Sequence, residues 1–540
     1  LNMYFGSFFQ GDPGNYEPRV DPTESCSANN ICSSLSIERT DIINIVMKMK
    51  NNKACGPDEI NVRILKEGII SLSVALQIIF DRSMRYTEIP SDWKVANVVP
   101  IFKKGSKKAA ANYRPVSLTS VVSKILEKIV KINVTKHLDR YNLINNTQHA
   151  LREGRSCLTN LLDYMEFVTE MVDDGNDVDV IYLDFSKVFD KVSHQRLVDK
   201  LNMYNIKGRV SKWIEEWLKN RRQRVQINGE KSDWISVKSG VPQGSVLGPL
   251  LFLICINDLE DRIHYGSKVW KFADDTKIAS TVNSYEGCFE LQRNLDKLMA
   301  WADEWKMTFN IDKCKVMHIG GKNINFNYEM NGVWLDEVQQ EKDLGIIIES
   351  NFKPSRQCME ARNKANKILG AINRNVVYKS KQVVSKLYTS LVRPHLEYCI
   401  QAWSPYYVHD LDMLERVQRR ATRMIPAICR LEYQDRLKEL NMFSIKRRCL
   451  RGDMIQVYKI VSGEDDSLLH SMFKLDTGNR VRGHNKKMIK EHCRLDIRKY
   501  FFSQRVVNFW NRLPPEVVNS RSIGIFKSRI DVYMNSIHLW

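Results

Sequence analysis

An acidic residue ends a strongly strand-like stretch of this sequence, which reads Val178-Asp179-Val180-Ile181-Tyr182-Leu183-Asp184. Its β-branched and aromatic residues are typical of a buried strand, so we expect a strand over residues 178–183 with Asp184 at its end. A second acidic feature follows 90 residues later, where Asp274 and Asp275 lie between the strand-like runs 269–271 and 277–279. This pattern predicts a strand, a turn and a strand over residues 269–280.

Two interpretations of the Asp274–Asp275 doublet remain open. Asp is favoured in turns, so an ordinary turn is one of them. Adjacent negative charges repel each other and are costly to desolvate, however, unless a cation neutralises them. Mg²⁺ prefers carboxylate and phosphate oxygens, and template-directed polymerases use two such ions about 3.5–4 Å apart. Carboxylates on neighbouring strands can bind that pair, which makes Asp184, Asp274 and Asp275 candidate ligands.

Two further segments have the composition of a nucleotide site. Residues 239–250 hold three glycines and two prolines before an apolar run, and glycines let a backbone approach a flat base pair closely. Lys103 and Arg114 flank a basic loop and have the charge to clamp a triphosphate. The alternatives are an ordinary loop that leads into a core helix and a solvated run of charge.

Composition narrows the class of protein. The 540 residues carry 82 Lys and Arg against 63 Asp and Glu, a net charge of +19, which favours a polyanionic partner: nucleic acid first, an acidic membrane surface second. The longest apolar run, Val246–Ile256, is too short to span a membrane. The 12 cysteines include no C-x-x-C pair, which indicates reduced thiols and an intracellular protein of the cytoplasm, the nucleus or both.

The remaining pattern is mostly helical. Ser120–Asp139 is predicted to be an amphipathic helix whose apolar face holds Val121, Ile125, Ile129 and Ile132. We also expect a strand over 93–102 and helices over 37–85 (interrupted at 53–58), over 197–218 and beyond about residue 350.

Several ordered blocks resemble those of reverse transcriptases, in the version found in non-LTR (LINE-like) retrotransposons of the jockey type. The central blocks are Tyr182–His194, Ser239–Pro249 and Phe272–Asp275. Pro100–Gly105 with Asn112–Leu118 is similar to the fingers block, Asn310–Cys314 to the late palm block, Leu344–Gly345 to the primer grip and Leu387–Tyr398 to the thumb segment.

This resemblance implies an α+β fold shaped as a right hand: fingers, a palm with an antiparallel sheet, and a helical thumb, followed by a helical basic C-terminal region. The expected domains are a linker or fragment edge at 1–36, fingers with an N-terminal helical extension at 37–170, the catalytic palm at 171–350, the thumb at 351–430 and the basic region at 431–540.

The resemblance also implies roles for individual residues. Asp184 and Asp274 would bind two Mg²⁺ ions (Mn²⁺ as the alternative), with Asp275 as an auxiliary ligand, and Lys313 would protonate the departing pyrophosphate. The remaining roles concern the nucleotide: the Phe185 carbonyl completes a metal shell, Phe189 excludes a ribose 2′-OH, Gln243 and Gly244 line the nascent base pair, and Lys103 and Arg114 hold the triphosphate.

The C-terminal part is expected to bind nucleic acid. Residues 431–540 hold 21 Lys and Arg against 12 Asp and Glu, and a basic groove follows a phosphate backbone. On the thumb-like segment, arginines recur at helical spacing: Arg416, Arg419, Arg420 and Arg423. The alternative is a solvated helix face. His484, His492 and Cys493 match no common zinc spacing, so no zinc site is expected.

The predicted function is an RNA-directed DNA polymerase that adds dNTPs to a primer 3′-OH on an RNA template, with DNA as a second template. Its partners would be the RNA template, a DNA primer or target DNA, and dNTPs, with no membrane; the oligomeric state stays open. The alternatives are an RNA-dependent RNA polymerase, which would lack an aromatic gate such as Phe189, a group II intron maturase, which typically ends in a cysteine-rich module, and a decayed retrotransposon remnant that binds nucleic acid without polymerising.

Because of three departures from the family pattern, the alternative of a decayed retrotransposon remnant remains open. The family usually has Ala at Val188, Pro at Ser193 and Gly-Phe at Ala150–Leu151. No apurinic-type endonuclease segment precedes residue 37, so we expect that activity to be absent here. Because the first residue is Leu1 and no signal-peptide pattern follows, we expect the sequence to begin inside a longer reading frame.

Overall fold

The computed structural model describes residues 1–9, 11, 31–33, 35–263, 266–465, 467–476 and 483–537. They form two compact units. The first comprises residues 1–148, 184–264 and 294–311, and the second comprises 149–183, 265–293 and 312–540. Both units combine helices with sheets in which most strand pairs are antiparallel, so the predicted mixture of helices and antiparallel sheet is confirmed.

The first unit contains a five-stranded sheet in the order β2-β1-β4-β5, with β6 also paired to β4. Its strands are β1 (Val95–Phe102), β2 (Tyr113–Leu118), β4 (Arg221–Ile227), β5 (Glu230–Lys231) and β6 (Ile235–Val237). Strands β1 and β2 are antiparallel, whereas β1 and β4 are parallel. The helices are α1 (Asn2–Gly6), α2 (Arg39–Lys48), α3 (Val62–Glu67), α4 (Ile69–Tyr86), α5 (Val121–Arg140), α7 (Val188–Lys191), α8 (His194–Met203), α9 (Gly208–Leu218) and α10 (Gly248–Cys255).

The second unit contains a five-stranded sheet in the order β12-β9-β3-β8-β7. Its strands are β3 (Val178–Leu183), β7 (Ser267–Phe272), β8 (Asp275–Thr281), β9 (Lys315–Ile319) and β12 (Asp336–Glu337). Strand β3 pairs antiparallel with β8 on one side and with β9 on the other. Two hairpins accompany this sheet: β10 (Glu329–Met330) with β11 (Val333–Trp334), and β13 (Gln340–Asp343) with β14 (Ile346–Glu349).

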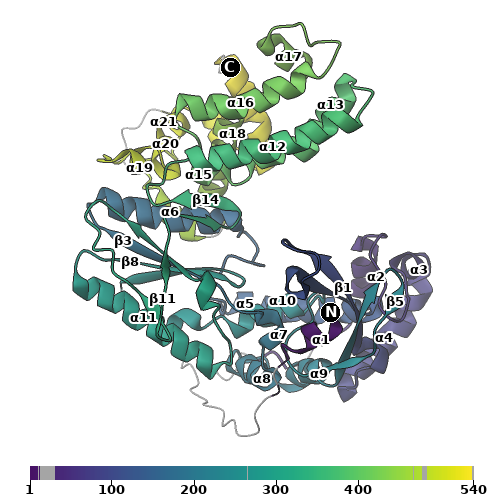
Figure 1. The fold of residues 1–540 in the computed structure, drawn as a ribbon. Coiled ribbons are helices and arrows are strands. Elements are labelled where there is room, and N and C mark those ends of the chain that lie inside the picture. The colour runs from purple at the N-terminus through teal and green to yellow at the C-terminus, as the bar shows by residue number, and fades with distance from the viewer. Residues whose placement is uncertain are drawn as a thin grey trace. The chain divides into compact units, whose positions relative to one another are not determined.

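Helices make up most of the rest of the second unit, and α12 and α16 lie side by side (Figure 1). These helices are α6 (Cys157–Asp173), α12 (Ser355–Asn375), α13 (Lys381–Leu387), α14 (Arg393–Glu397), α15 (Ile400–Trp403), α16 (Val408–Arg423), α17 (Tyr433–Glu439), α18 (Ile445–Ser462), α19 (Asp496–Lys499), α20 (Phe502–Arg505), α21 (Val507–Trp510), α22 (Pro515–Val518) and α23 (Ile523–Ser536). Helix α11 (Tyr285–Glu304) contributes residues to both units.

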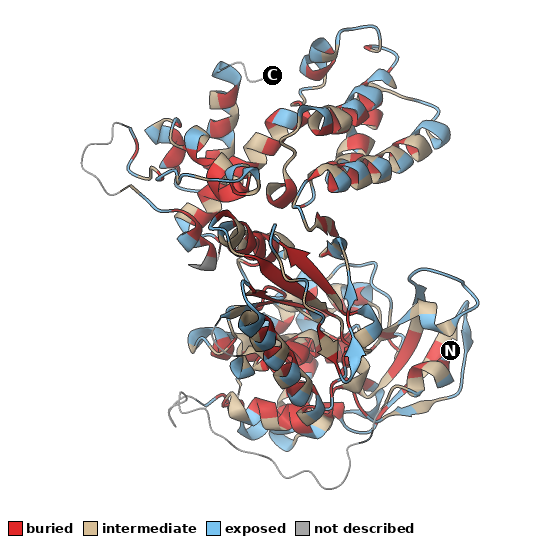
Figure 2. Ribbon diagram, turned by 60° about the vertical axis from the view of Figure 1, so that its left-hand side comes forward, coloured by how far each residue is buried: buried red, intermediate tan, exposed pale blue. Residues whose placement is uncertain are grey.

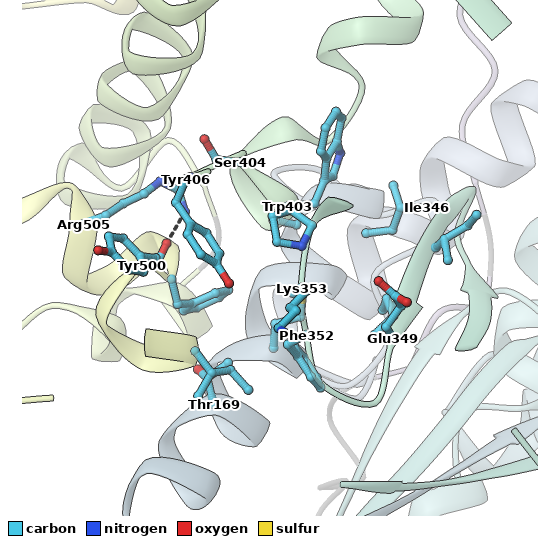
Figure 3. A pocket seen from close by; sticks show the side chains of 17 residues that line it. Thr169, Ile346, Glu349, Phe352, Lys353, Trp403, Ser404, Tyr406, Tyr500 and Arg505 are labelled. Carbon is cyan, nitrogen blue, oxygen red and sulfur yellow. Dashed lines mark hydrogen bonds between the residues drawn. The ribbon is translucent and has the colours of Figure 1, made fainter. Parts of the chain in front are cut away.

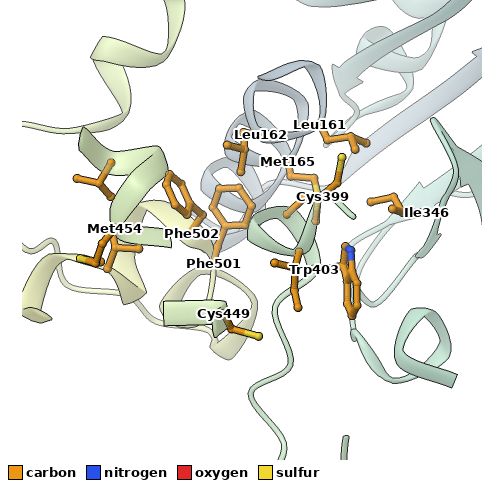
Figure 4. Close-up of a cluster of buried hydrophobic side chains, with 14 of the residues drawn as sticks. Leu161, Leu162, Met165, Ile346, Cys399, Trp403, Cys449, Met454, Phe501 and Phe502 are labelled. Atoms are coloured by element: carbon orange, nitrogen blue, oxygen red, sulfur yellow. The ribbon is translucent and has the colours of Figure 1, made fainter. Parts of the chain in front are cut away.

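A continuous hydrophobic core joins the sheet of the second unit to its C-terminal helices. Strand β3 is buried except at the half-buried Tyr182, and the strands of this sheet are largely red in Figure 2. Leu161 and Met165 of α6 belong to the same cluster as Trp403 of α15 and Phe501 and Phe502 near the C-terminus (Figure 4). Because one core includes all these segments, the described part of residues 431–537 packs as part of the second unit.

The predicted strand over 178–183 is confirmed with the same bounds, and a hairpin occupies residues 267–281 as expected. The strand predicted over 93–102 begins two residues later, at Val95, because Ser91–Trp93 form a 3₁₀ turn. The helix predicted from Ser120 begins at Val121, because Ser120 is its N-cap and accepts the Ser123 N–H at 3.3 Å. Ile132, expected on the buried face of this helix, is exposed. None of the helices in the described residues combines the length and apolar character that crossing a bilayer requires.

Residues 10, 12–30 and 34 of the expected linker lie outside the described residues. Helix α1, within the same segment, was not predicted; Phe5 is buried against Val98 and Val225. Several cysteines are buried free thiols, as the composition predicts: Cys255, Cys288, Cys358 and Cys449. The proposed domain boundaries stay a prediction.

A buried carboxylate holds the glycine-rich loop of the first unit against α5. Glu127 is fully buried and accepts the backbone N–H groups of Val246 at 2.8 Å and Leu247 at 3.3 Å. Ser123 donates its hydroxyl to the same carboxylate at 3.0 Å. These amides immediately precede α10, where helix geometry leaves N–H groups without intrahelical partners. Glu127 therefore fixes the point at which the loop enters α10.

Glu127→Ala should destabilise the chain by about 2–4 kcal/mol, because it leaves two buried amides without an acceptor. Glu127→Gln keeps one acceptor oxygen and should cost about half as much. Thermal unfolding of the full chain measures both, with the exposed Lys136→Ala on the same helix as the control. Equal melting temperatures for Glu127→Ala and the control would show that the carboxylate does not hold the loop.

Candidate active site

The Asp274–Asp275 doublet lies at the turn of the β7–β8 hairpin in the second unit. Phe272 pairs with Asp275, so Ala273 and Asp274 form a two-residue connection. Ala273 has φ = 55°, a left-handed conformation that an alanine rarely adopts. Asp274 is half-buried and Asp275 is exposed. The tight turn thus presents both carboxylates at one end of strand β8.

The register of the same sheet determines what lies beside that turn. In the antiparallel β3–β8 ladder, Leu183 is the partner of Thr276. Asp184 follows Leu183 in the chain, and Asp275 precedes Thr276. The chain therefore leaves β3 at Asp184 at the end of the ladder where β8 begins.

Lys313 precedes the strand on the other side of β3. It is exposed in the short 3₁₀ turn Ile311–Lys313, two residues before Lys315, the partner of Tyr182. Because β9 runs antiparallel to β3, its first residues lie beside the last residues of β3. Lys313 is therefore at the same end of the sheet as the Asp274–Asp275 turn.

The backbone after Asp184 is held by the segment 308–310 of the first unit. The Asp184 carbonyl accepts the Asn310 N–H at 2.7 Å, and Ser186 donates its N–H to the Thr308 carbonyl at 2.8 Å. Phe185 forms an isolated antiparallel bridge with Phe309, and their rings stack with centroids 4.4 Å apart. These contacts fix the direction in which the chain continues from Asp184.

Phe189 and the glycine-rich loop lie together in the first unit. The Phe189 ring packs on Phe252 at 4.5 Å between centroids, and its carbonyl accepts the Val241 N–H at 2.8 Å. Gln243 donates its side-chain amide to both carboxylate oxygens of Asp190, at 3.1 and 3.2 Å. Burial raises the pKa of Asp190 above its ordinary value, although the bond from Gln243 opposes that shift. Residues of a common pocket include Phe189, Asp190 and Gln243.

Gly244 is required by a close approach of the loop to strand β2. Its φ is +124°, and a Cβ there would lie 2.5 Å from the Ser117 carbonyl oxygen. The Ser117 N–H in turn donates to the Gln243 carbonyl at 2.7 Å. A side chain at position 244 would therefore push the loop off β2, which gives Gly244 a structural role at the position expected beside the base pair.

Lys103 and Arg114 lie on the exposed β1–β2 hairpin. The Lys103 N–H donates to the Asn112 carbonyl at 2.8 Å, and Arg114 is the partner of Ile101 in the ladder. The charges of Lys187 and Arg114 both act to lower the pKa of Asp190. Arg114 is thus within electrostatic reach of the pocket that holds Phe189 and Gln243.

Asp190 and Glu127 are polar residues that the sequence analysis did not single out. Asp190 lies within the block Tyr182–His194, and an acidic residue beside the expected aromatic gate was a signal that pointed to it. Glu127 carried no comparable signal, because its partners are 119 and 120 residues away.

All four predicted arginines are exposed on α16 of the second unit. Two of them are already paired: Asp412 contacts Arg416 at 2.7 Å and Arg419 at 3.3 Å. The opposite face of the helix is buried through Leu414, Val417 and Ala421. The helical spacing therefore marks a solvent-facing basic surface, with part of its charge neutralised by Asp412.

A separate pocket in the second unit holds none of the predicted site residues (Figure 3). Tyr406 and Tyr500 stack there with ring planes 5° apart, and Arg505 donates to Asp453 at 2.8 and 3.0 Å. One of its two cations, Arg505, is engaged by a buried carboxylate, and the other, Lys353, is exposed.

Within the described residues, no group of three or more His, Cys, Asp or Glu side chains is arranged to hold a metal ion. A polymerase site needs only a few carboxylates, because Mg²⁺ completes its shell with water and substrate phosphates. The oxygen donors at the end of the β3–β8 ladder are of the type that this ion prefers. They suit a hard divalent cation, whereas zinc sites more often use sulfur and nitrogen ligands.

Known proteins resemble the chain over this region. A family described as "Reverse transcriptase (RNA-dependent DNA polymerase)" matches residues 101–370, half of the chain. The "Probable RNA-directed DNA polymerase from transposon BS" of Drosophila melanogaster is 25% identical over 410 residues, which cover 71% of this chain and 44% of that protein. The "RNA-directed DNA polymerase from mobile element jockey" of the same organism is 24% identical over 408 residues, 73% of this chain and 44% of that protein.

The chain thus spans less than half the length of these relatives. The family match nevertheless includes strand β3, the glycine-rich loop and the Asp274–Asp275 hairpin, the segments whose geometry is described above. With half of its residues matched, the chain belongs to the reverse transcriptase family.

Proposed function

We propose that this chain is the polymerase part of a non-LTR retrotransposon protein and adds dNTPs to a primer 3′-OH on an RNA template, with DNA as a second template. The observation that carries this proposal is the β3–β8 register, which pairs Leu183 with Thr276. Asp184 and the Asp274–Asp275 turn are the residues that immediately adjoin this pair. An acid at a strand end beside an acidic turn is the arrangement that the polymerase reaction needs.

In this proposal, Asp184 and Asp274 bind two Mg²⁺ ions, with Mn²⁺ as the alternative, and Asp275 is an auxiliary ligand. Such ions lower the pKa of the primer hydroxyl and stabilise the leaving pyrophosphate. The Phe185 carbonyl adds a neutral oxygen donor directly after Asp184. Lys313, exposed at the same end of the sheet, is proposed to protonate the pyrophosphate.

The nucleotide would be bound by residues of the first unit. Lys103 and Arg114 carry charge on an exposed hairpin and suit a triphosphate, where Arg binds two oxygens at once. Phe189 packs on Phe252, and its ring is proposed to exclude a ribose 2′-OH. Gln243 and Gly244 are proposed to line the base pair, with the side chain of Gln243 oriented by Asp190.

This function implies which segments of the chain form the palm, thumb and fingers of a right-hand polymerase. The sheet of the second unit is proposed as the palm, because it carries β3 and the Asp274–Asp275 hairpin. Helices α12 to α16 are proposed as the thumb, the β1–β2 hairpin as part of the fingers, and residues 431–540 as the basic C-terminal region. The RNA template, the DNA primer or target DNA, and dNTPs are the proposed partners.

Asp274→Ala should lower dTTP incorporation on poly(rA)/oligo(dT) by about three orders of magnitude, because it removes a proposed metal ligand. The exposed Asp41→Asn on α2 serves as the control and should leave incorporation unchanged. If wild type and Asp274→Ala incorporate equally little, the alternative holds: a remnant that binds nucleic acid without polymerising.

Phe189→Ala should weaken discrimination against rNTPs by about 10–100-fold, because it removes the ring that collides with a 2′-OH. The measurement is the ratio of kcat/KM for dTTP and UTP on the same primer–template. Phe189→Tyr keeps the bulk and should keep the ratio. A ratio that Phe189→Ala leaves at the wild-type value would place the sugar gate at another residue.

Arg420→Gln with Arg423→Gln should flatten the salt dependence of RNA–DNA duplex binding by about one to two units of log–log slope. The matched pair, Arg416→Gln with Arg419→Gln, should have a smaller effect, because Asp412 already neutralises part of that charge. Equilibrium binding between low and moderate salt measures both slopes. Slopes equal to wild type in both double variants would show that α16 does not contact phosphates.

A further inference from the structure

A lysine is buried in the second unit, on the strand that begins at the Asp274–Asp275 turn. Lys277 lies on β8 two residues after Asp275 and is 3% exposed. Its ammonium donates to Asn160 Oδ1 of α6 at 2.9 Å and forms an ion pair with Asp343. The same nitrogen lies 4.4 Å from the centroid of the Tyr164 ring. Lys277 is therefore fully engaged inside the protein and is not a surface cation available to a phosphate.

Asp343 connects this lysine to a tight turn. It is the last residue of β13 and the partner of Ile346 across the β13–β14 hairpin. The two residues between them, Leu344 and Gly345, have φ values of 44° and 92°. Positive φ at both central positions is typical of a type I′ hairpin, and it is unfavourable for a leucine. Contacts from outside the hairpin can offset that cost.

Tyr398 provides further support, from the segment after α14. Its hydroxyl donates to the Leu344 carbonyl at 2.9 Å. A Cβ added at Gly345 would lie 3.4 Å from the Tyr398 ring, so the ring also packs against the turn. The Leu344–Gly345 turn is thus held from two directions, by Lys277 of β8 through Asp343 and by Tyr398.

An ion pair in such a place needs an explanation beyond stability. Burying two charges costs free energy that their attraction often fails to recover, and apolar residues of similar volume frequently stabilise as well or better. What an ion pair adds is a specific partner, since a buried charge left without its counter-ion is strongly unfavourable. Here the pairing relates the hairpin turn to the strand that begins with Asp275.

We propose that Lys277 and Asp343 are a positioning pair that holds the β13–β14 turn at a fixed place relative to the Asp274–Asp275 turn, and thereby sets the primer 3′ end against the catalytic carboxylates. This inference rests on the proposed function. Neither residue touches substrate; both act through the Leu344–Gly345 turn, which the sequence resemblance relates to the primer grip.

The test uses the full chain with Lys277→Met and Asp343→Leu combined, apolar replacements that keep most of the buried volume. The readout is the ratio of extension rates from a matched oligo(dT) primer and from one with a 3′-terminal mismatch, on poly(rA). Loss of folded protein lowers both rates equally and leaves the ratio unchanged. Loss of positioning lowers the matched rate more, so the ratio should fall by about tenfold, since small misplacements of reacting groups are costly.

The matched control is a second buried pair of this unit, which joins α6 to α19. Arg498 contacts Glu166 at 2.7 Å with side-chain exposures of 5% and 14%. Arg498→Met with Glu166→Leu should leave the primer ratio at the wild-type value, even where it lowers the melting temperature. A fall of the ratio in both double variants would overturn the proposal, because it would reflect general loosening of the unit.

Tyr398→Phe tests whether the position of the Leu344–Gly345 turn matters, without disturbing the buried charges. Tyr398 is 44% exposed, so the variant should fold. It removes the bond to the Leu344 carbonyl, together with the contacts of the same hydroxyl with Cys157 and Cys399, and should lower the ratio by about two- to threefold. This variant decides the matter if the double variant of Lys277 and Asp343 does not fold: an unchanged ratio in Tyr398→Phe then overturns the proposal.

The positioning role of the Lys277–Asp343 pair and the polymerase function are distinguishable by these measurements. If wild type extends primers and the Lys277–Asp343 double variant keeps the wild-type ratio, the positioning role is wrong and the polymerase function stands. If wild type extends no primer and matches Asp274→Ala, the proposed function fails, and the positioning role fails with it.

Discussion

The antiparallel register of β3 and β8 is the constraint on which the site depends. Side chains alternate across a sheet, so a slip of one residue would turn every side chain of β3 to the opposite face. Val178, Val180 and Ile181 are fully buried, and such a slip would move each of them to the other face of the sheet. The same hydrophobic packing that fixes this register also determines where the chain leaves β3 at Asp184. Positions of polar groups at the strand end are thus set by apolar groups along the strand.

In the loops, polar side chains fix the position of the backbone. Glu127 receives the amides at the entrance of α10, Asp190 orients the side chain of Gln243, and Lys277 engages Asp343 at the Leu344–Gly345 turn. Glycines alone would let these loops approach a substrate, but they would also leave them free to adopt other conformations. Each carboxylate limits that freedom at a single point, which leaves the loop backbone close to where a nucleotide or primer is proposed to bind.

The local elements of the fold were predictable from sequence, whereas the contacts between distant residues were not. The strands 95–102 and 178–183 follow from runs of β-branched residues, and Ser120 follows from the preference for serine at helix N-caps. The bond between Gln243 and Asp190 joins residues 53 positions apart, and that between Lys277 and Asp343 joins residues 66 apart, so no local pattern contains either. Ile132 shows that helical spacing alone does not decide which apolar residues are buried. The pairing of Arg416 with Asp412 could have been found, because an i, i+4 spacing of opposite charges is a known helical signal.

The central claim is that Asp184 and Asp274 bind one pair of divalent cations at the end of the β3–β8 ladder. Anomalous diffraction from crystals grown with Mn²⁺, a primer–template and a non-hydrolysable dNTP tests it most directly. Two manganese peaks roughly 3.5–4 Å apart, each contacted by carboxylate oxygens of Asp184 and Asp274, are the expected result. Ordered primer and nucleotide with the manganese bound by other side chains, or with no peak at these two aspartates, would contradict it.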